Sequence, residues 1–151
     1  MSETTGIVEP PAGLSQGPGT DAAIGGRLFD ASTIDHRRLA YDTRLERVRL
    51  FVEQRYAEPL PLDRVAQVAG LEKSYFSKYF HQKTGVCFHD WLHWIRVGHA
   101  IELMRSRELS VTEVAYAVGF QDLRTFERAF TRCTGQCPKT MKKQILADLR
   151  S

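Results

Sequence analysis

One pattern of residues occurs twice in this chain, and this repeat constrains the fold more than any other feature. The stretch VAQVAGLEKSYFSKYFHQKTG at residues 65–85 is matched by EVAYAVGFQDLRTFERAFTRCTG at residues 113–135. The matched pairs are Val65 and Val114, Ala66 and Ala115, Gly70 and Gly119, Phe76 and Phe126, Phe80 and Phe130, Thr84 and Thr134, Gly85 and Gly135, and Cys87 and Cys137. The first three pairs are 49 residues apart and the others are 50 apart, so the copies differ by one residue in the turn after the glycine.

The first copy predicts two short helices joined by a glycine turn. A helix at about 62–69 is closed by Gly70, because glycine adopts the left-handed conformation at a helix end without a side-chain clash. A second helix at about 73–83 is closed by Thr84 and Gly85. This is the arrangement of a helix-turn-helix motif.

The second copy repeats this arrangement with a stronger start signal. Ser110 and Glu113 form the capping-box pattern, in which each side chain bonds the backbone amide of the other residue. The short helix then runs to Val118 with Gly119 after it, and the following helix runs from about 123 to 133.

Three further helices complete the predicted architecture. Thr43 and Glu46 match a capping box that begins a first amphipathic helix, which Pro59 stops. The apolar rhythm of residues 88–106 predicts a connector helix of about 18 residues. A last helix begins at Pro138, where a missing N–H costs nothing. The predicted fold is all-α, with seven helices, no strand, and two helix-turn-helix subdomains joined by a long connector.

The predicted domains follow from composition and from the repeat. Residues 1–40 form a low-complexity arm that we expect to be disordered, followed by a first helix-turn-helix subdomain at 41–87, the connector at 88–106 and a second subdomain at 107–151. The arm carries three basic and five acidic residues, a net charge of −2, so the whole-chain charge of +3 leaves +5 for the rest. A basic folded part is compatible with nucleic acid but is not specific for it.

Several classes of protein are disfavoured by the sequence. No apolar run approaches the roughly 20 residues of a membrane span, and no secretory signal is visible, so we expect a cytoplasmic, nucleoid-associated protein. No nucleophile-and-base set, carboxylate pair or phosphate-binding glycine loop indicates an enzyme or a cofactor. The His89–His93 and Cys133–Cys137 spacings match metal ligands weakly, and we interpret Cys87, Cys133 and Cys137 as buried thiols.

Residues from about 45 to 143 resemble the DNA-binding domain of the AraC/XylS family, most closely its small MarA-like members. The matching residues are LDRVAQVAGLEKSYFSKYFHQKTG, the connector IRVGHAIELM and the run VTEVAYAVGFQDLRTFERAFTRCTGQCPKTMK. His99, Glu72 and Met141 depart from the family pattern, in which an arginine, a serine cap and an aromatic residue are usual. The resemblance implies a bacterial transcription factor, commonly an activator that binds near a promoter and touches RNA polymerase through its sigma factor or alpha subunit.

The second helix of each copy supplies the candidate base-reading residues. Because the paired phenylalanines must face the core, the neighbouring positions face outward, and the same positions form the base-contacting faces of the resembling family. The candidates are Ser74, Tyr75, Ser77 and Lys78 in the first copy, and Leu123, Arg124, Glu127 and Arg128 in the second. Arginine can fork onto guanine, leucine can pack on a thymine methyl group and glutamate can accept from cytosine. An alternative role for Glu127, which is equally well supported, is an ion pair with Arg124 or Arg128 on the surface of the same helix.

Basic residues near helix ends are candidates for phosphate contacts, with a solvated side chain as the alternative for each: Lys73, Lys83, Arg132, Lys139 and Lys142. A connector of about 18 residues spans about 27 Å. With the width of the flanking helices added, the two helix-turn-helix motifs are separated by a distance near the roughly 34 Å repeat of the major groove, so one chain can reach two grooves without dimerising. We therefore expect a monomer on double-stranded promoter DNA. Two alternatives remain open: the detached DNA-binding half of a larger ligand-sensing regulator, and an all-helical module that binds an acidic protein.

Overall fold

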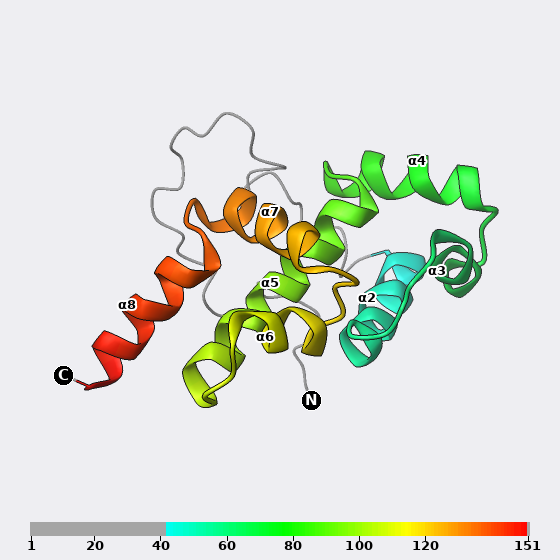
Figure 1. Cartoon of the computed structure of the whole chain (residues 1–151). Coiled ribbons are helices and arrows are strands. Elements are labelled where there is room, and N and C mark those ends of the chain that lie inside the picture. The colour runs from blue at the N-terminus through cyan, green and yellow to red at the C-terminus, as the bar shows by residue number, and fades with distance from the viewer. Residues whose placement is uncertain (1–41, 151) are drawn as a thin grey trace, which may run out of the picture. The chain divides into compact units, whose positions relative to one another are not determined.

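The computed structural model describes residues 42–150, which form seven α-helices and no strand (Figure 1). The expected arm at residues 1–40 lies outside this described part. The helices are α2 (Thr43–Arg55), α3 (Leu62–Ala69), α4 (Lys73–Thr84), α5 (Phe88–Ser106), α6 (Val111–Ala117), α7 (Leu123–Thr134) and α8 (Pro138–Arg150). The described residues divide into two compact units after Leu92, inside α5. The all-α prediction is confirmed.

The start of α2 corrects one prediction. Asp42, not Thr43, is the N-cap, and its carboxylate accepts from the amides of Arg44 at 3.0 Å and Leu45 at 3.2 Å. Thr43 is already the first helical residue. Both residue types cap well, so the local pattern did not decide between them. The reason lies outside α2, because Asp42 also accepts a hydrogen bond from the hydroxyl of Tyr79 on α4.

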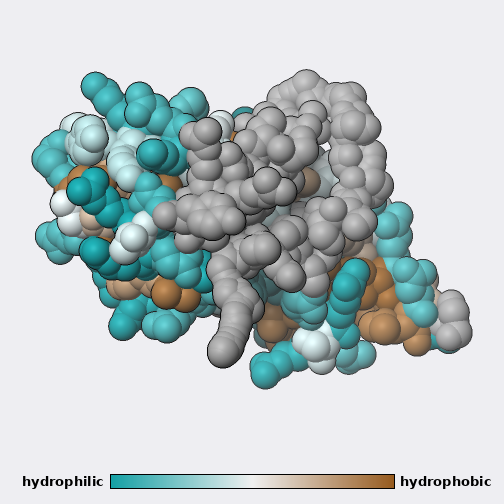
Figure 2. All heavy atoms as spheres, turned by 180° about the vertical axis from the view of Figure 1, so that it is seen from behind, coloured by the Kyte–Doolittle hydropathy of each residue, from teal (hydrophilic) through white to brown (hydrophobic). Residues whose placement is uncertain are grey.

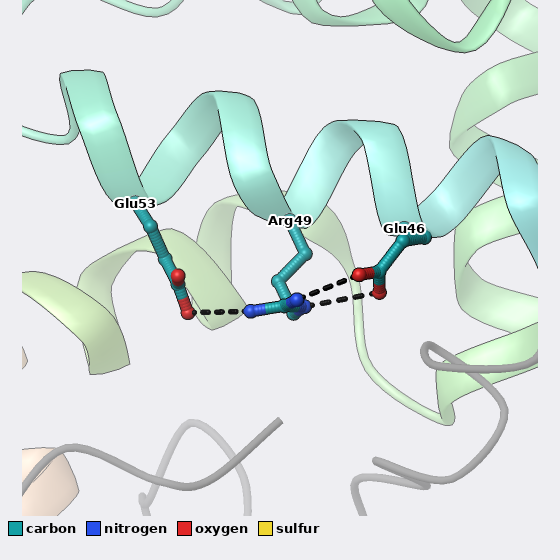
Figure 3. A network of polar contacts seen from close by, with 3 residues as sticks. All are labelled: Glu46, Arg49 and Glu53. Carbon is teal, nitrogen blue, oxygen red and sulfur yellow. Dashed lines mark hydrogen bonds and ion pairs between the residues drawn. The ribbon is translucent and has the colours of Figure 1, made fainter. Parts of the chain in front are cut away.

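Glu46, which was expected to complete that capping box, instead pairs along the helix. Its carboxylate accepts from the Arg49 guanidinium at 2.7 Å and 3.1 Å, and Glu53 accepts from the same guanidinium at 3.0 Å (Figure 3). These i,i+3 and i,i+4 pairs cover one side of α2. The hydrogen bond to Glu46 is the main cause that raises the pKa of Arg49.

The turn of the helix-turn-helix motif has the same backbone hydrogen bonds in both copies. In the first, the amide of Leu71 donates to the carbonyl of Ala66 at 3.0 Å, and in the second, Phe120 donates to Ala115 at 3.1 Å. The glycine of each turn has a positive φ, of 74° and 105° respectively. The repeat in the sequence is thus a repeat in structure.

The one-residue offset between the copies lies where the sequence placed it. After the turn glycine, two residues (71–72) precede α4 in the first copy, whereas three (120–122) precede α7 in the second. The helix α6 ends at Ala117, with Val118 as its C-cap, so the prediction that this helix runs to Val118 was one residue long. The capping box of Ser110 and Glu113 is confirmed, with hydrogen bonds of 3.0 and 2.8 Å.

The end of each repeat corrects the prediction for two cysteines. Cys87 and Cys137 are exposed rather than buried, and Cys133 is half-buried. The carbonyl oxygens of Cys87 and Cys137 accept the first helical hydrogen bonds of α5 and α8, from Trp91 and Met141 at 3.1 Å each. These cysteines occupy helix-start positions, where the side chain turns to solvent. Within residues 42–150, no group of three or more histidine, cysteine, aspartate or glutamate side chains could hold a metal ion.

Aromatic side chains form the core of the first unit. Phe80 contacts Phe76, Phe88 and Trp91 at ring-centroid distances of 5.8, 5.6 and 5.4 Å. All four are at most 2% exposed. Leu45, Val48 and Val52 of α2 are fully buried as well, as the apolar spacing of that helix predicts.

The core of the second unit repeats the aromatic pair. Phe126 contacts Phe130 at 5.5 Å and Phe120 at 5.2 Å. Arg96 of α5 is only 8% exposed, and its guanidinium carbon lies 5.8 Å from the ring centre of Phe120. Burial lowers the pKa of Arg96 to about 10, so the side chain stays charged at neutral pH. Trp94 is also buried, and the interpretation of both tryptophans as core residues is confirmed.

The surface of the described residues leaves few large apolar side chains in solvent. Hydrophobic side chains gather on the side where α8 lies (Figure 2), and Leu149 of that helix is 62% exposed. None of the described helices combines the length and apolarity that a membrane crossing requires.

The aromatic core of the first unit predicts a large effect of one truncation. Phe80→Ala removes a fully buried ring that contacts three others, and we expect it to lower the free energy of unfolding by about 3–5 kcal/mol. Urea unfolding followed by tryptophan fluorescence measures this. Ser77→Ala on the exposed face of the same helix is the control, with an expected change within about 0.5 kcal/mol. Equal effects of the two substitutions would contradict the packing described here.

Candidate DNA interface

The candidate base-reading residues of the first copy all lie on the exposed side of α4. Ser74, Tyr75, Ser77 and Lys78 are exposed, while Phe76 and Phe80 of the same helix are fully buried. Tyr75 is 54% exposed, which is unusual for so large a ring. The helix therefore presents two hydroxyls, one phenol and one ammonium group to solvent.

The start of α4 is capped by the residue that departs from the family pattern. The Glu72 carboxylate accepts from the amide of Tyr75 at 3.1 Å, so glutamate performs the role that a serine cap usually has. Hydrogen bonds from the amides of Ser74 and Tyr75 lower the pKa of Glu72. Although glutamate replaces the usual serine, the amide of Tyr75 at the start of the helix still has a side-chain acceptor.

The candidate residues of the second copy lie along one side of α7. Arg124 and Arg128 are exposed, whereas Leu123 and Glu127 are half-buried. Arg124, Glu127 and Arg128 line a shallow, open groove together with Thr131 and Arg132, which continue the same helix face. Each of these residues lies three or four positions from another member of the set, so together they form a stripe along the helix axis.

The guanidinium donors of the two arginines in this stripe are not engaged in an ion pair with any described residue. Among the ion pairs between residues 42–150, none within 4.0 Å involves Arg124, Glu127 or Arg128. The proposed pairing of Glu127 with either arginine is therefore not formed in this structure. The parallel N–H donors of each guanidinium group can therefore bind a planar acceptor with two hydrogen bonds.

Asp122 fixes the start of α7. Its carboxylate accepts from the amide of Thr125 at 2.7 Å and from the hydroxyl of the same residue at 3.0 Å. These hydrogen bonds are the main cause that lowers the pKa of Asp122, and the charge of Arg128 contributes. The cap thus sets the direction in which the first turn of α7, with Leu123 and Arg124, projects.

The candidate phosphate-binding residues differ in their surroundings. Arg132 and Lys139 are exposed, and Lys142 is half-buried. Lys73 forms an exposed ion pair with Asp63 at 3.6 Å, which a phosphate would have to displace. Lys83 is half-buried, with its ammonium nitrogen 5.6 Å from the ring centre of Tyr79.

Tyr79 and Arg44 were missed by the sequence analysis. The guanidinium carbon of Arg44 lies 5.8 Å from the Tyr79 ring centre, so this tyrosine contacts a cation from α2 as well as Lys83 of its own helix. Tyr79 also stacks edge-on against Tyr75 at 5.9 Å. The spacing of Tyr75 and Tyr79, four residues apart on a helix, was a signal for this contact.

Two copies of a short helix, a glycine turn and an exposed polar helix define a protein of the double helix-turn-helix class. The profile of a family described as "Helix-turn-helix domain" matches residues 65–144. The chain belongs to this family, in its branch of AraC-type DNA-binding domains. The family is not one of enzymes.

Relatives and solved structures agree with this assignment. The HTH-type transcriptional regulator YijO of Escherichia coli K12 is 30% identical over 133 residues, which covers 82% of this chain and 47% of that protein. The Msm operon regulatory protein of Streptococcus mutans is 24% identical, and the match covers 78% of this chain and 42% of that protein. This chain therefore spans about half the length of these relatives.

The DNA-binding domain of the global transcriptional factor AdpA, solved in complex with a target DNA, is 26% identical, with a TM-score of 0.63. That match covers 67% of this chain and 91% of that chain. An AraC-type regulator from Chromobacterium violaceum shares the fold at 20% identity and a TM-score of 0.63, over 70% of this chain and 94% of that one.

The capping of α7 predicts a dependence of stability on pH. Because the pKa of Asp122 is lower in the folded state, its stabilising contribution is complete above the ordinary aspartate pKa of about 4 and is lost as the pH falls through the lowered value. We expect Asp122→Ala to melt below the wild type at neutral pH. The difference in melting temperature shrinks below about pH 4. A difference that stays constant down to acid pH would contradict this.

Proposed function

We propose that this chain reads two adjacent half-sites on promoter DNA by placing α4 and α7 in successive major grooves. The observation that carries this proposal is the stripe on α7, where two exposed arginines without ion-pair partners among the described residues flank a glutamate. An exposed guanidinium with unused donors fits the O6 and N7 atoms of guanine. Arg124 and Arg128 therefore read guanines, Glu127 accepts from a cytosine amino group and Leu123 packs on a thymine methyl group.

In this proposal the first copy discriminates less between bases than the second. Its exposed side carries Ser74, Ser77 and Lys78, which have less directional chemistry than a pair of arginines. Tyr75 adds a ring that can lie against a base edge or a sugar. Sequence discrimination is thus concentrated in the half-site under α7, and the half-site under α4 contributes mainly affinity.

The connector supports the use of adjacent grooves. The helix α5 is continuous over 19 residues, which corresponds to a length of about 28 Å. Successive major grooves on one side of B-DNA are roughly 34 Å apart. One chain then supplies the two reading heads that a dimer supplies in simpler helix-turn-helix proteins, so the chain binds as a monomer.

The regulatory output is activation through RNA polymerase, by contact with its sigma factor or alpha subunit, while the protein is bound near a promoter in the nucleoid. The exposed face of α2 and the basic ends of the second copy are available for this contact, whereas α5 is exposed only near its two ends. A second proposal is that these helices form the DNA-binding part of a larger ligand-sensing regulator, which accords with the greater length of the relatives.

Selection of bound duplexes from a random DNA pool tests the proposed function. We expect a motif with two half-sites about one helical turn apart, and stronger base preferences in one of them. A pool that shows no sequence preference, together with binding to acidic proteins, would instead favour an all-helical protein-interaction module.

The assignment of base-reading and phosphate-binding roles on α7 predicts a contrast between two arginines. Arg128→Ala should cost about 1–3 kcal/mol of discrimination at one or two base positions, because a bidentate contact to guanine is lost. Arg132→Ala, one turn further along the same helix face, is the matched control and should weaken binding equally for all sequences. Titration of each variant against single-base variants of the selected duplex measures both. Unchanged discrimination at every position in Arg128→Ala would refute the assignment.

A further inference from the structure

Tyr79 is the centre of a cluster that joins α2 to the recognition helix α4. Its hydroxyl donates to the carboxylate of Asp42, which at the same time caps α2. Arg44 and Lys83 each lie within 6 Å of its ring centre, at 5.8 and 5.6 Å. Burial raises the pKa of the Tyr79 hydroxyl and the bond to Asp42 raises it further, so the phenol is protonated at neutral pH and can donate. We call these four residues the Tyr79 cluster.

The Tyr79 cluster carries a net charge of +1, because the two cations exceed the single carboxylate of Asp42. That carboxylate is engaged by the Tyr79 hydroxyl and by two amides of α2. The amides of Arg44 and Leu45 in the first turn of α2 are therefore occupied, and an incoming anion is met by side chains. Arg44 is exposed and forms no ion pair within residues 42–150.

The cluster lies on the flank of α4, between its outward face and α2. Tyr75 and Tyr79 are four residues apart and in edge-on contact, so a continuous aromatic strip leads from the exposed face to Arg44. An α-helix with its side chains is about 10–12 Å across, and the major groove is about 12 Å wide. A helix that enters the groove therefore brings its flanks against the sugar-phosphate strands.

The second copy has no counterpart of this cluster. With the shift of 50 residues, Tyr75, Tyr79 and Lys83 correspond to Thr125, Ala129 and Cys133. None of these three can hold a cation against an aromatic ring. Each copy therefore has a basic feature that the other lacks: the second has the arginine stripe of α7, and the first has the Tyr79 cluster.

We propose that the Tyr79 cluster is a phosphate-binding site in which Arg44 and Lys83 clamp the DNA backbone beside α4 and Tyr79 holds Arg44 in place. It rests on the proposed entry of α4 into a major groove. Arg44 is a binding residue here and Tyr79 is a positioning residue. The first copy therefore anchors the protein on DNA through phosphates, and the second copy reads the sequence.

The salt dependence of binding by the full chain tests this proposal. Each phosphate contact contributes about 0.9 to the slope of log K against log of salt concentration. We expect Arg44→Ala to reduce the magnitude of this slope by about 0.9, measured by fluorescence anisotropy between about 50 and 200 mM salt. The loss should be equal for the selected duplex and for a shuffled duplex of the same composition, because phosphates carry no sequence information.

Two further variants separate this role from general charge and from folding. Arg47→Ala removes an exposed arginine one turn along α2, and we expect it to leave the slope unchanged. Tyr79→Phe keeps the ring and removes only the bond to Asp42, so it should weaken binding less than Arg44→Ala while also acting equally on both duplexes. Wild-type melting temperature in each variant excludes a folding defect, and Arg44→Lys, which keeps the charge, should restore the slope.

An unchanged slope in Arg44→Ala would overturn the proposal, as would a loss of equal size in Arg47→Ala. Either result would leave the reading role of α7 intact, provided that the wild type still selects a two-part motif. Absence of a steep salt slope in the wild type itself would count against the proposed function as a whole. The two failures are thus distinguishable.

Discussion

Burial of two phenylalanine pairs sets which side of α4 and of α7 faces solvent. Phe76 and Phe80 are fully buried in the first unit, and Phe126 and Phe130 are fully buried in the second. A pair four residues apart fixes one side of a helix toward the core and therefore fixes which residues face solvent. The stripe of Arg124, Glu127 and Arg128 on α7 and the exposed side of α4 are consequences of this one constraint. The same helical spacing therefore determines which residues pack in the core and which are exposed for the proposed DNA contacts.

The repeated helix-turn-helix backbone carries different side-chain chemistry on the surface of each copy. The turn hydrogen bonds and the aromatic pairs recur, while the outward positions are hydroxyls and one lysine in the first copy and a glutamate with two arginines in the second. Discrimination between bases needs directional donors and acceptors, whereas affinity needs only charge near phosphates. A duplicated motif can therefore divide these two tasks between its copies.

Most of the fold was predictable because its signals are local. The glycine turns, the capping box of Ser110 and the start of α8 at Pro138 each depend on residues within one turn of the chain. The helices α3 and α7 accordingly lie at the expected residues to within one position. The sequence also identified the paired phenylalanines as core.

The error at the start of α2 arose because a distant contact decides which residue caps the helix. Asp42 rather than Thr43 caps α2, and Asp42 is held by Tyr79, which is 37 residues away. The same contact places Arg44 against Tyr79, so the cluster of cations beside α4 was invisible to a reading of local patterns. Cys87 and Cys137 were assigned to the core from their places in the repeat, but their backbone starts α5 and α8 and their side chains face solvent. Which bases the outward residues contact stays a prediction, since it depends on a duplex.

Hydroxyl-radical footprinting on a selected duplex tests the central claim most directly, because it reports protection of the backbone strand by strand. Binding by one chain to two successive major grooves predicts two protected patches on one face of the duplex, centred about 10 base pairs apart, at a stoichiometry of one protein per duplex. A single protected patch, or two patches that require two chains, would contradict the account.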